Sequence, residues 1–197
     1  EGESAFKNRD YKTAARSWRH ALLDDANNGV LMLMMGQALF ANAQFDESAG
    51  ITQLALQSLP VEKWDVVVRN FRDLYSKVDD YTDQLRALEK ASKDKPDDPA
   101  ARFLLGYHYG FLGYPNDAVK QLEKCVAAAP QDETARKLLD LFTGKQTNDA
   151  AETNTIPDRP DVPKLNEAPV PPSPTNNRLL LPPPPPPLPM SDDSASE

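Results

Sequence analysis

The chain has 197 residues, which is enough for one domain of ordinary size with residues to spare. Its formal net charge of −8 argues against nucleic acid or an anionic membrane surface as a partner, because both bind clustered lysine and arginine. A single cysteine excludes an intrachain disulfide and a four-thiolate zinc site. No apolar run approaches the roughly 18 residues that membrane insertion requires.

Prolines divide the chain into two regions. Of the 19 prolines, 14 follow residue 150, whereas every glycine, tryptophan and cysteine lies before residue 145. Residues 143–197 contain no aromatic side chain and few aliphatic ones, so they cannot bury enough surface to offset the entropy of the chain. We therefore predict a folded body over residues 1–142 and a disordered, proline-rich tail over residues 143–197.

The body is an internal repeat. Four columns of similar residues recur at common spacings of 34, 36 and 34 residues, and four columns that keep one register indicate a repeated structural unit. The columns are Ala26, Pro60, Pro96, Pro130; Ala21, Ala55, Ala91, Cys125; Tyr11, Phe45, Tyr81, Pro115; and Gly2, Gly36, Arg72, Gly106.

Within each unit, apolar residues recur at helical spacing. The stretch Tyr11–Leu23, for example, places Ala14, Trp18 and Leu22 on one helix face. Each unit is therefore predicted to fold as two helices joined by a short turn, and proline ends three of the units because it cannot continue a helix. In chain order we predict a partial unit over residues 1–28, units over 29–62, 65–98 and 99–132, and an amphipathic capping helix over 133–142.

This pattern resembles the tetratricopeptide repeat (TPR) over roughly residues 1–130. The residues that carry the resemblance are Gly36, Leu39, Phe45, Ala55 and Pro60 in one unit, and Gly106, Tyr109, Ala118 and Pro130 in another. The resemblance implies an all-α fold, a helix-turn-helix solenoid wound as a right-handed superhelix, in which each pair must stack on its neighbours. The runs YTDQLRALEKA, ARFLLGYHY and DAVKQLEKCV are also similar to a group of bacterial TPR proteins abundant in planctomycetes.

The third unit departs most from the repeat. Arg72 stands where the other units have glycine, and two extra residues lie around residues 61–64. Gln84 stands where Ala14 and Ala118 occur in the first and fourth units. Because small residues let paired helices approach closely, the third unit is the least regular of the four.

The TPR resemblance also implies a ligand surface. The first helices of TPR units line a concave groove, which here is mainly apolar and aromatic with a charged middle. Aromatic anchors and a few charges suit an extended or helical peptide, so we predict a protein or peptide partner. The groove residues are Leu33, Gln37, Phe40, Arg69, Asp73, Lys77, Phe103, Tyr107 and Phe111.

Few residues are candidates for catalysis or metal binding. His108 is expected to be a packing histidine, because no nucleophile or second base recurs near it. Cys125 lies on the small-residue column and is expected to be a buried structural thiol. The pairs Asp24–Asp25, Asp79–Asp80 and Asp97–Asp98 lie at inter-helix turns, where aspartate caps helices, and lack a calcium loop. With no phosphate loop, dinucleotide fingerprint or HExxH, we expect no enzyme, cofactor or metal.

The tail contains a candidate ligand motif for another protein. Residues 178–189 read RLLLPPPPPPLP, and six consecutive prolines favour the polyproline II helix that aromatic-lined grooves recognise. The end of the run, PPLP, is similar to ligands of one WW class. The alternative is a stiff spacer. The motif residues are Arg178, Pro182, Pro185, Pro186, Pro187, Leu188 and Pro189.

These features together favour a non-enzymatic scaffold or adaptor that binds a partner peptide in the concave groove. Two alternatives stay open, a structural or spacer protein and the regulatory TPR part of a larger protein. The chain begins without methionine and in mid-helix, so we expect further residues upstream. One cysteine fits cytoplasm or periplasm, and the proline-rich tail favours an exported or envelope protein.

Overall fold

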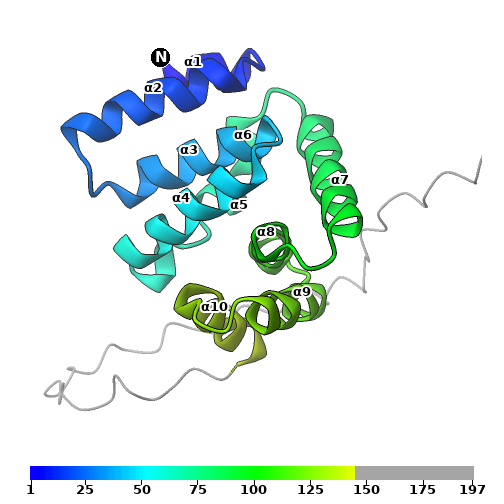
Figure 1. Cartoon of the computed structure of the whole chain (residues 1–197). Helices are drawn as coiled ribbons and strands as arrows, with labels where there is room; N and C mark the ends of the chain where they lie inside the picture. Colours follow the sequence, from blue (N-terminus) through cyan, green and yellow to red (C-terminus); the bar gives the residue numbers. More distant parts are fainter. Residues whose placement is uncertain (145–197) are drawn as a thin grey trace, which may run out of the picture. The chain divides into compact units, whose positions relative to one another are not determined.

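The computed structural model describes residues 1–144, and this part of the chain is built from ten α-helices and one short 3-10 helix, without a strand (Figure 1). The all-α prediction is therefore confirmed for these residues. The helices are α1 (Gly2–Lys7), α2 (Tyr11–Asp24), α3 (Gly29–Ala41), α4 (Phe45–Ser58), η1 (Val61–Lys63), α5 (Val66–Arg69), α6 (Phe71–Leu74), α7 (Val78–Asp94), α8 (Pro99–Phe111), α9 (Pro115–Ala128) and α10 (Glu133–Thr143).

Three pairs of consecutive helices pack together in the same way. They are α1 with α2, α3 with α4, and α8 with α9. In each pair the first helix has its column glycine pressed against the second helix. A Cβ atom on Gly2 would lie 2.6 Å from Trp18 Nε1, and one on Gly106 would lie 2.4 Å from Leu122 Cγ. A Cβ atom on Gly36 would likewise come within 2.7 Å of a side-chain oxygen on α4. The glycine column therefore marks where paired helices approach too closely for a side chain.

The same three pairs are joined by turns of the same type. The second residue after the first helix adopts a left-handed backbone at Arg9 (φ 65°), Ala43 (φ 57°) and Gly113 (φ 90°). The next amide then donates to a carbonyl five residues back, from Asp10 to Ala5 at 2.9 Å in the first pair. This is the Schellman arrangement, which satisfies free carbonyls at a helix end. The three turns lie in the register of the repeat columns, although only one of them has the glycine that favours this backbone.

Replacing Ala43 with glycine should raise the free energy of unfolding by about 0.5–1 kcal/mol, because glycine adopts φ 57° without the Cβ penalty. The matched control is Ala87→Gly, the same change at an exposed position inside α7, which should lower the free energy of unfolding by about 1 kcal/mol. Urea unfolding of both variants tests whether their free energies of unfolding change in opposite directions. A destabilising Ala43→Gly would contradict the left-handed assignment of this turn.

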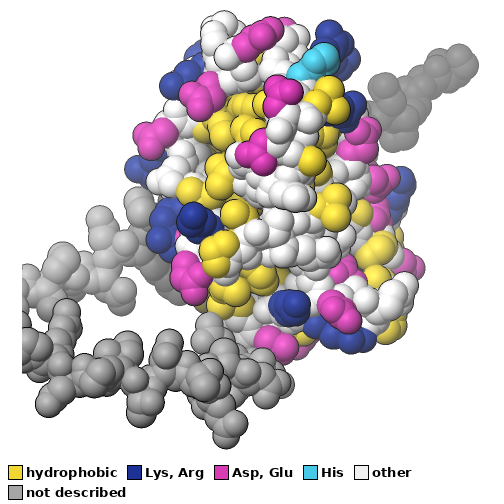
Figure 2. Space-filling view, turned by 90° about the vertical axis from the view of Figure 1, so that its left-hand side faces the viewer, with side chains coloured by type: hydrophobic (Ala, Val, Ile, Leu, Met, Phe, Trp, Pro, Cys, Tyr) yellow, Lys and Arg dark blue, Asp and Glu magenta, His cyan; other side chains and the backbone are white. Residues whose placement is uncertain are grey.

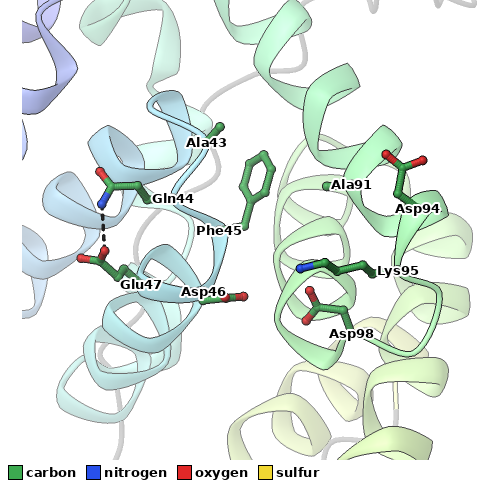
Figure 3. A pocket seen from close by; sticks show the side chains of 9 residues that line it. All are labelled: Ala43, Gln44, Phe45, Asp46, Glu47, Ala91, Asp94, Lys95 and Asp98. Carbon is green, nitrogen blue, oxygen red and sulfur yellow. Dashed lines mark hydrogen bonds between the residues drawn. The ribbon is translucent and has the colours of Figure 1, made fainter.

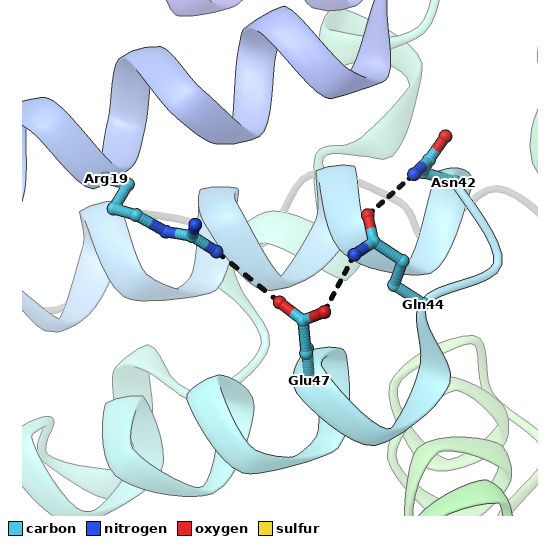
Figure 4. Close-up of polar contacts among 4 residues, drawn as sticks. All are labelled: Arg19, Asn42, Gln44 and Glu47. Carbon is cyan, nitrogen blue, oxygen red and sulfur yellow. Dashed lines mark hydrogen bonds and ion pairs between the residues drawn. The ribbon is translucent and has the colours of Figure 1, made fainter.

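Side-chain hydrogen bonds fix the helix starts and tie the first two pairs together. Asp98 Oδ1 accepts from the Ala100 amide at 2.9 Å, so this predicted cap residue does cap α8. Figure 4 shows a polar chain in which Arg19 of α2 donates to Glu47 of α4 at 3.4 Å, and Gln44 donates to the same carboxylate at 2.8 Å. These groups are exposed, so each contact contributes little stability, but together they fix the α3–α4 turn against α2.

The third unit differs from the predicted helix pair. Its first helix is broken into η1, α5 and α6, and the chain then runs extended through Tyr75 (ψ 132°) and Lys77 (ψ 125°). Arg72, within α6, stands at the close-approach position that glycine occupies in the other units, where an arginine side chain cannot fit. In the structure its side chain is exposed instead. Asn70 Nδ2 donates to the Val66 carbonyl at 2.7 Å and so competes with continuation of α5.

As a consequence, the fourth pair packs directly on the second. Helix α8 packs against α4 as well as against α7, and α10 also reaches α4. Gln57 Nε2 of α4 donates to Thr134 Oγ1 of α10 at 2.9 Å. Figure 1 shows α7 set to one side of these stacked pairs. Helix α10 lies where the sequence predicts a capping helix, while its capping role, the bounds of the units and the right-handed superhelix stay predictions.

Candidate binding surfaces

The apolar residues predicted to line the groove are brought together but are covered. Helix α3 contributes Leu33, Gln37 and Phe40, and α8 contributes Phe103 and Tyr107. We call these five residues the inner surface. None of them is more than 3% exposed, so they line no open groove in this structure. Whether they bind a peptide stays a prediction.

The inner surface is covered by the irregular part of the third unit, residues 61–77, which we call the covering segment. The Tyr107 hydroxyl donates to the Trp64 carbonyl at 2.8 Å, and Gln37 Nε2 donates to the Tyr75 hydroxyl at 2.8 Å. Helix α5 packs on both α3 and α8. The third unit, which the sequence predicts as one wall of the groove, therefore packs over these five residues instead.

The charged groove residues lie on the outside of this cover. Arg69, Asp73 and Lys77 are all exposed, and Arg69 pairs with Asp65 of the same turn. They do not form the middle of a groove floor, because the helix that would have turned them inward is broken. Phe111 is half-buried at the end of α8, where its ring meets the Phe142 ring of α10 edge-on at 5.2 Å.

His108 lies in the core beside the inner surface. Its ring packs against the Phe40 ring at a tilt of 33°, with 4.2 Å between the ring centroids, and its Nδ1 is 2.7 Å from the Tyr81 hydroxyl. Burial lowers the pKa of His108 to about 3 and raises that of Tyr81 well above its usual value. Both groups are therefore neutral at pH 7, and the Tyr81 hydroxyl and Nδ1 share one hydrogen bond. The predicted packing role of His108 agrees with this geometry.

The other candidates for chemistry are also accounted for by structure. Cys125 is fully buried, its Sγ lies 3.4 Å from the Pro99 carbonyl, and burial raises its pKa to about 12. A thiol in this state is a poor nucleophile. Asp80 pairs with Arg9 at 2.9 Å, and Asp25 accepts from the Asn28 side chain at 3.0 Å. Within residues 1–144 no three histidine, cysteine or acidic side chains gather as a metal would require.

A second surface, which sequence reasoning missed, is a cleft of about 430 Å³ between the α3–α4 turn and the C-terminal end of α7 (Figure 3). The Phe45 ring points into it between Ala43 and Ala91, while Gln44 and Glu47 point away. The lining contains four carboxylates and one lysine, which favours cationic over anionic groups. The lining residues are Ala43, Gln44, Phe45, Asp46, Glu47, Ala91, Asp94, Lys95 and Asp98.

No sequence signal could have revealed this cleft, because its two walls lie about 50 residues apart and meet only where α7 leaves the stack. The polar contacts of its carboxylates are structural ones. Asp94 accepts from Lys90 at 2.8 Å, and Asp98 caps α8. The cleft is therefore a by-product of the irregular third unit rather than a built ligand site.

Exposed hydrophobic side chains are scattered over the described surface. Figure 2 shows one face, on which hydrophobic groups are separated by acidic and basic ones. No helix within residues 1–144 combines the length and hydrophobicity needed to cross a membrane. The candidate tail motif, Arg178 with Pro182, Pro185, Pro186, Pro187, Leu188 and Pro189, lies outside the described residues.

Comparison with known proteins adds little to these observations. No protein-family model matches the chain, and no curated protein matches its sequence. Among solved structures, MamA 41-end from Desulfovibrio magneticus RS-1 is similar at 17% identity and a TM-score of 0.33, covering 73% of this chain and 80% of that one. The MamA RS-1 ArsTM double mutant is similar at 16% identity and a TM-score of 0.33, covering 75% and 82%. At this TM-score the likeness supports no conclusion about arrangement or function.

Proposed function

We propose that the chain is a non-enzymatic, TPR-like interaction scaffold that holds a peptide segment of a partner protein on its inner surface. The observation that supports the proposal is that an irregular segment of the chain itself, made of short helical turns and an extended end, already packs on this surface. The covering segment is fixed there by an aromatic anchor, Tyr75, and by hydrogen bonds to α3 and α1. These are the kinds of contact by which grooves bind peptides.

The chemistry of the core supports a binding role over catalysis. His108 is the residue best placed to act as a base, yet it is buried, neutral and hydrogen-bonded to Tyr81. Cys125 is buried and held as a thiol. A catalytic base has to reach a substrate and to have a pKa near the working pH, and His108 does neither.

A structural role is the second candidate, and the covered inner surface favours it. If the covering segment never leaves, the described residues form a closed helical body without a groove. The first candidate requires the segment to open. The two candidates therefore differ in one property, which is access to the inner surface.

Site-specific photo-crosslinking in the cell that makes the protein distinguishes them. A photoreactive residue would replace Lys7 or Lys77, which are exposed at the edge of the covering segment, or Lys124, which is exposed on α9. We expect one partner to be crosslinked from positions 7 and 77 and not from position 124. The same products from all three positions, or none from any, would support the structural role.

A further inference from the structure

Tyr75 fills a pocket whose walls come from three other helices. Its ring lies edge-on to Phe6 of α1 at 4.8 Å and to Tyr81 of α7 at 5.3 Å. Its hydroxyl accepts from Gln37 Nε2 at 2.8 Å and donates to Gln84 Oε1 at 2.5 Å. The pocket thus satisfies both the donor and the acceptor capacity of a phenol.

Tyr75, Ser76 and Lys77 form an extended link between α6 and α7. The backbone is extended at Tyr75, and Ser76 Oγ donates to the Lys7 carbonyl of α1 at 2.5 Å. Asp73, Ser76 and Lys77 are exposed. The preceding helices α5 and α6 have four residues each, which is too short for either to be stable without its anchors.

We propose that this pocket recognises tyrosine, and that Tyr75 is an internal stand-in which a partner segment displaces. The partner segment would present a tyrosine from an extended backbone. This inference rests on the proposed function and names the chemistry of its ligand. Local opening of the covering segment exposes the pocket while Phe6, Gln37, Tyr81 and Gln84 stay on their own helices.

The hydrogen bonds make the pocket selective. Gln37 is only 3% exposed, so a phenylalanine in place of tyrosine would leave its buried amide without an acceptor. The resulting loss of affinity is about tenfold or more. In the parent chain, Tyr75 competes intramolecularly at an effective concentration on the order of millimolar, so external ligands bind more weakly than they would to an empty pocket.

The test removes the Tyr75 side chain from the pocket and then adds a peptide whose tyrosine can take its place. The full chain with Tyr75→Ala is titrated by calorimetry with a peptide of residues 70–78, NFRDLYSKV, and with the same peptide carrying phenylalanine in place of tyrosine. We expect saturable binding of the tyrosine peptide, at least about tenfold tighter than that of the phenylalanine peptide and at least about tenfold tighter than to the parent chain. A double variant, Gln37→Ala with Tyr75→Ala, should lose the preference for tyrosine.

Two outcomes overturn the proposal: a folded Tyr75→Ala chain that binds neither peptide, or one that binds both equally. If the Tyr75→Ala variant does not fold, hydrogen exchange of the parent chain tests the proposal instead. The amides of residues 71–77 should then exchange by local opening, at a rate that low concentrations of urea do not change. If these amides exchange only when the whole protein unfolds, the proposal is overturned. Failure of the crosslinking experiment with success here would mean that the pocket recognises tyrosine while the proposed scaffold function fails and the structural role is favoured.

Discussion

Replacing Phe103 with alanine should lower the free energy of unfolding by about 3–5 kcal/mol. The ring is 0% exposed in the core between the stacked pairs, so its removal loses the burial of the side chain and leaves a cavity. An open groove, as the sequence predicts, would place this ring in solvent, where truncation is nearly neutral. Urea unfolding of the full chain, followed by far-UV circular dichroism, separates the two arrangements.

The matched control is Phe111→Ala, the same truncation in the same helix. Phe111 is half-buried at the end of α8, so its loss should cost about half as much as that of Phe103 or less. The ratio between the two variants is more informative than either value alone, because changes in the unfolded state largely cancel. Equal small effects at both positions would show that the inner surface is not covered in solution.

The regular pairs could be predicted from sequence because a single physical requirement repeats in them. Gly2, Gly36 and Gly106 all prove to be positions where a Cβ atom would collide with the partner helix. The left-handed turn residues were not predicted, although they keep the same register. Arg9 and Ala43 give no composition signal for this backbone, which is normally marked by glycine.

The structure of the third unit could be predicted from the sequence only in part. Arg72 in the glycine column marks the unit as irregular, and the structure shows its first helix broken on either side of α6, which contains Arg72. Tertiary packing decides where residues 61–77 lie. The ring of Tyr75 contacts Phe6, which is 69 residues earlier in the sequence, and no local sequence pattern predicts such a contact. The repeat register places Leu33, Gln37, Phe40, Phe103 and Tyr107 on helices that lie near one another, but it could not show that these side chains are buried or that Arg69, Asp73 and Lys77 are exposed on the covering segment.

The stability of the protein should also fall steeply with acidification because of His108. In the folded chain its pKa is about 3, whereas an unfolded histidine has a pKa of about 6.5. Between these values the unfolded state binds a proton that the folded state does not, so the free energy of unfolding rises with pH in this range. The contribution is complete above pH 6.5 and is lost by about 1.4 kcal/mol for each pH unit below it, down to about pH 3.

Urea unfolding of the parent chain and of His108→Gln across pH 4–7 isolates this effect. The glutamine variant should be less stable at pH 7, since it fits the Phe40 ring less well, but its stability should fall less steeply below pH 6.5. Carboxylates titrate in both proteins at the acid end, so the quantity to compare is the difference between the two slopes. His20→Gln, at an exposed position on α2, makes the same substitution outside the core and is the matched control for His108→Gln. Parallel curves for the parent and His108→Gln would mean that the covering segment admits water and a proton to His108, and that the inner surface is already open in solution.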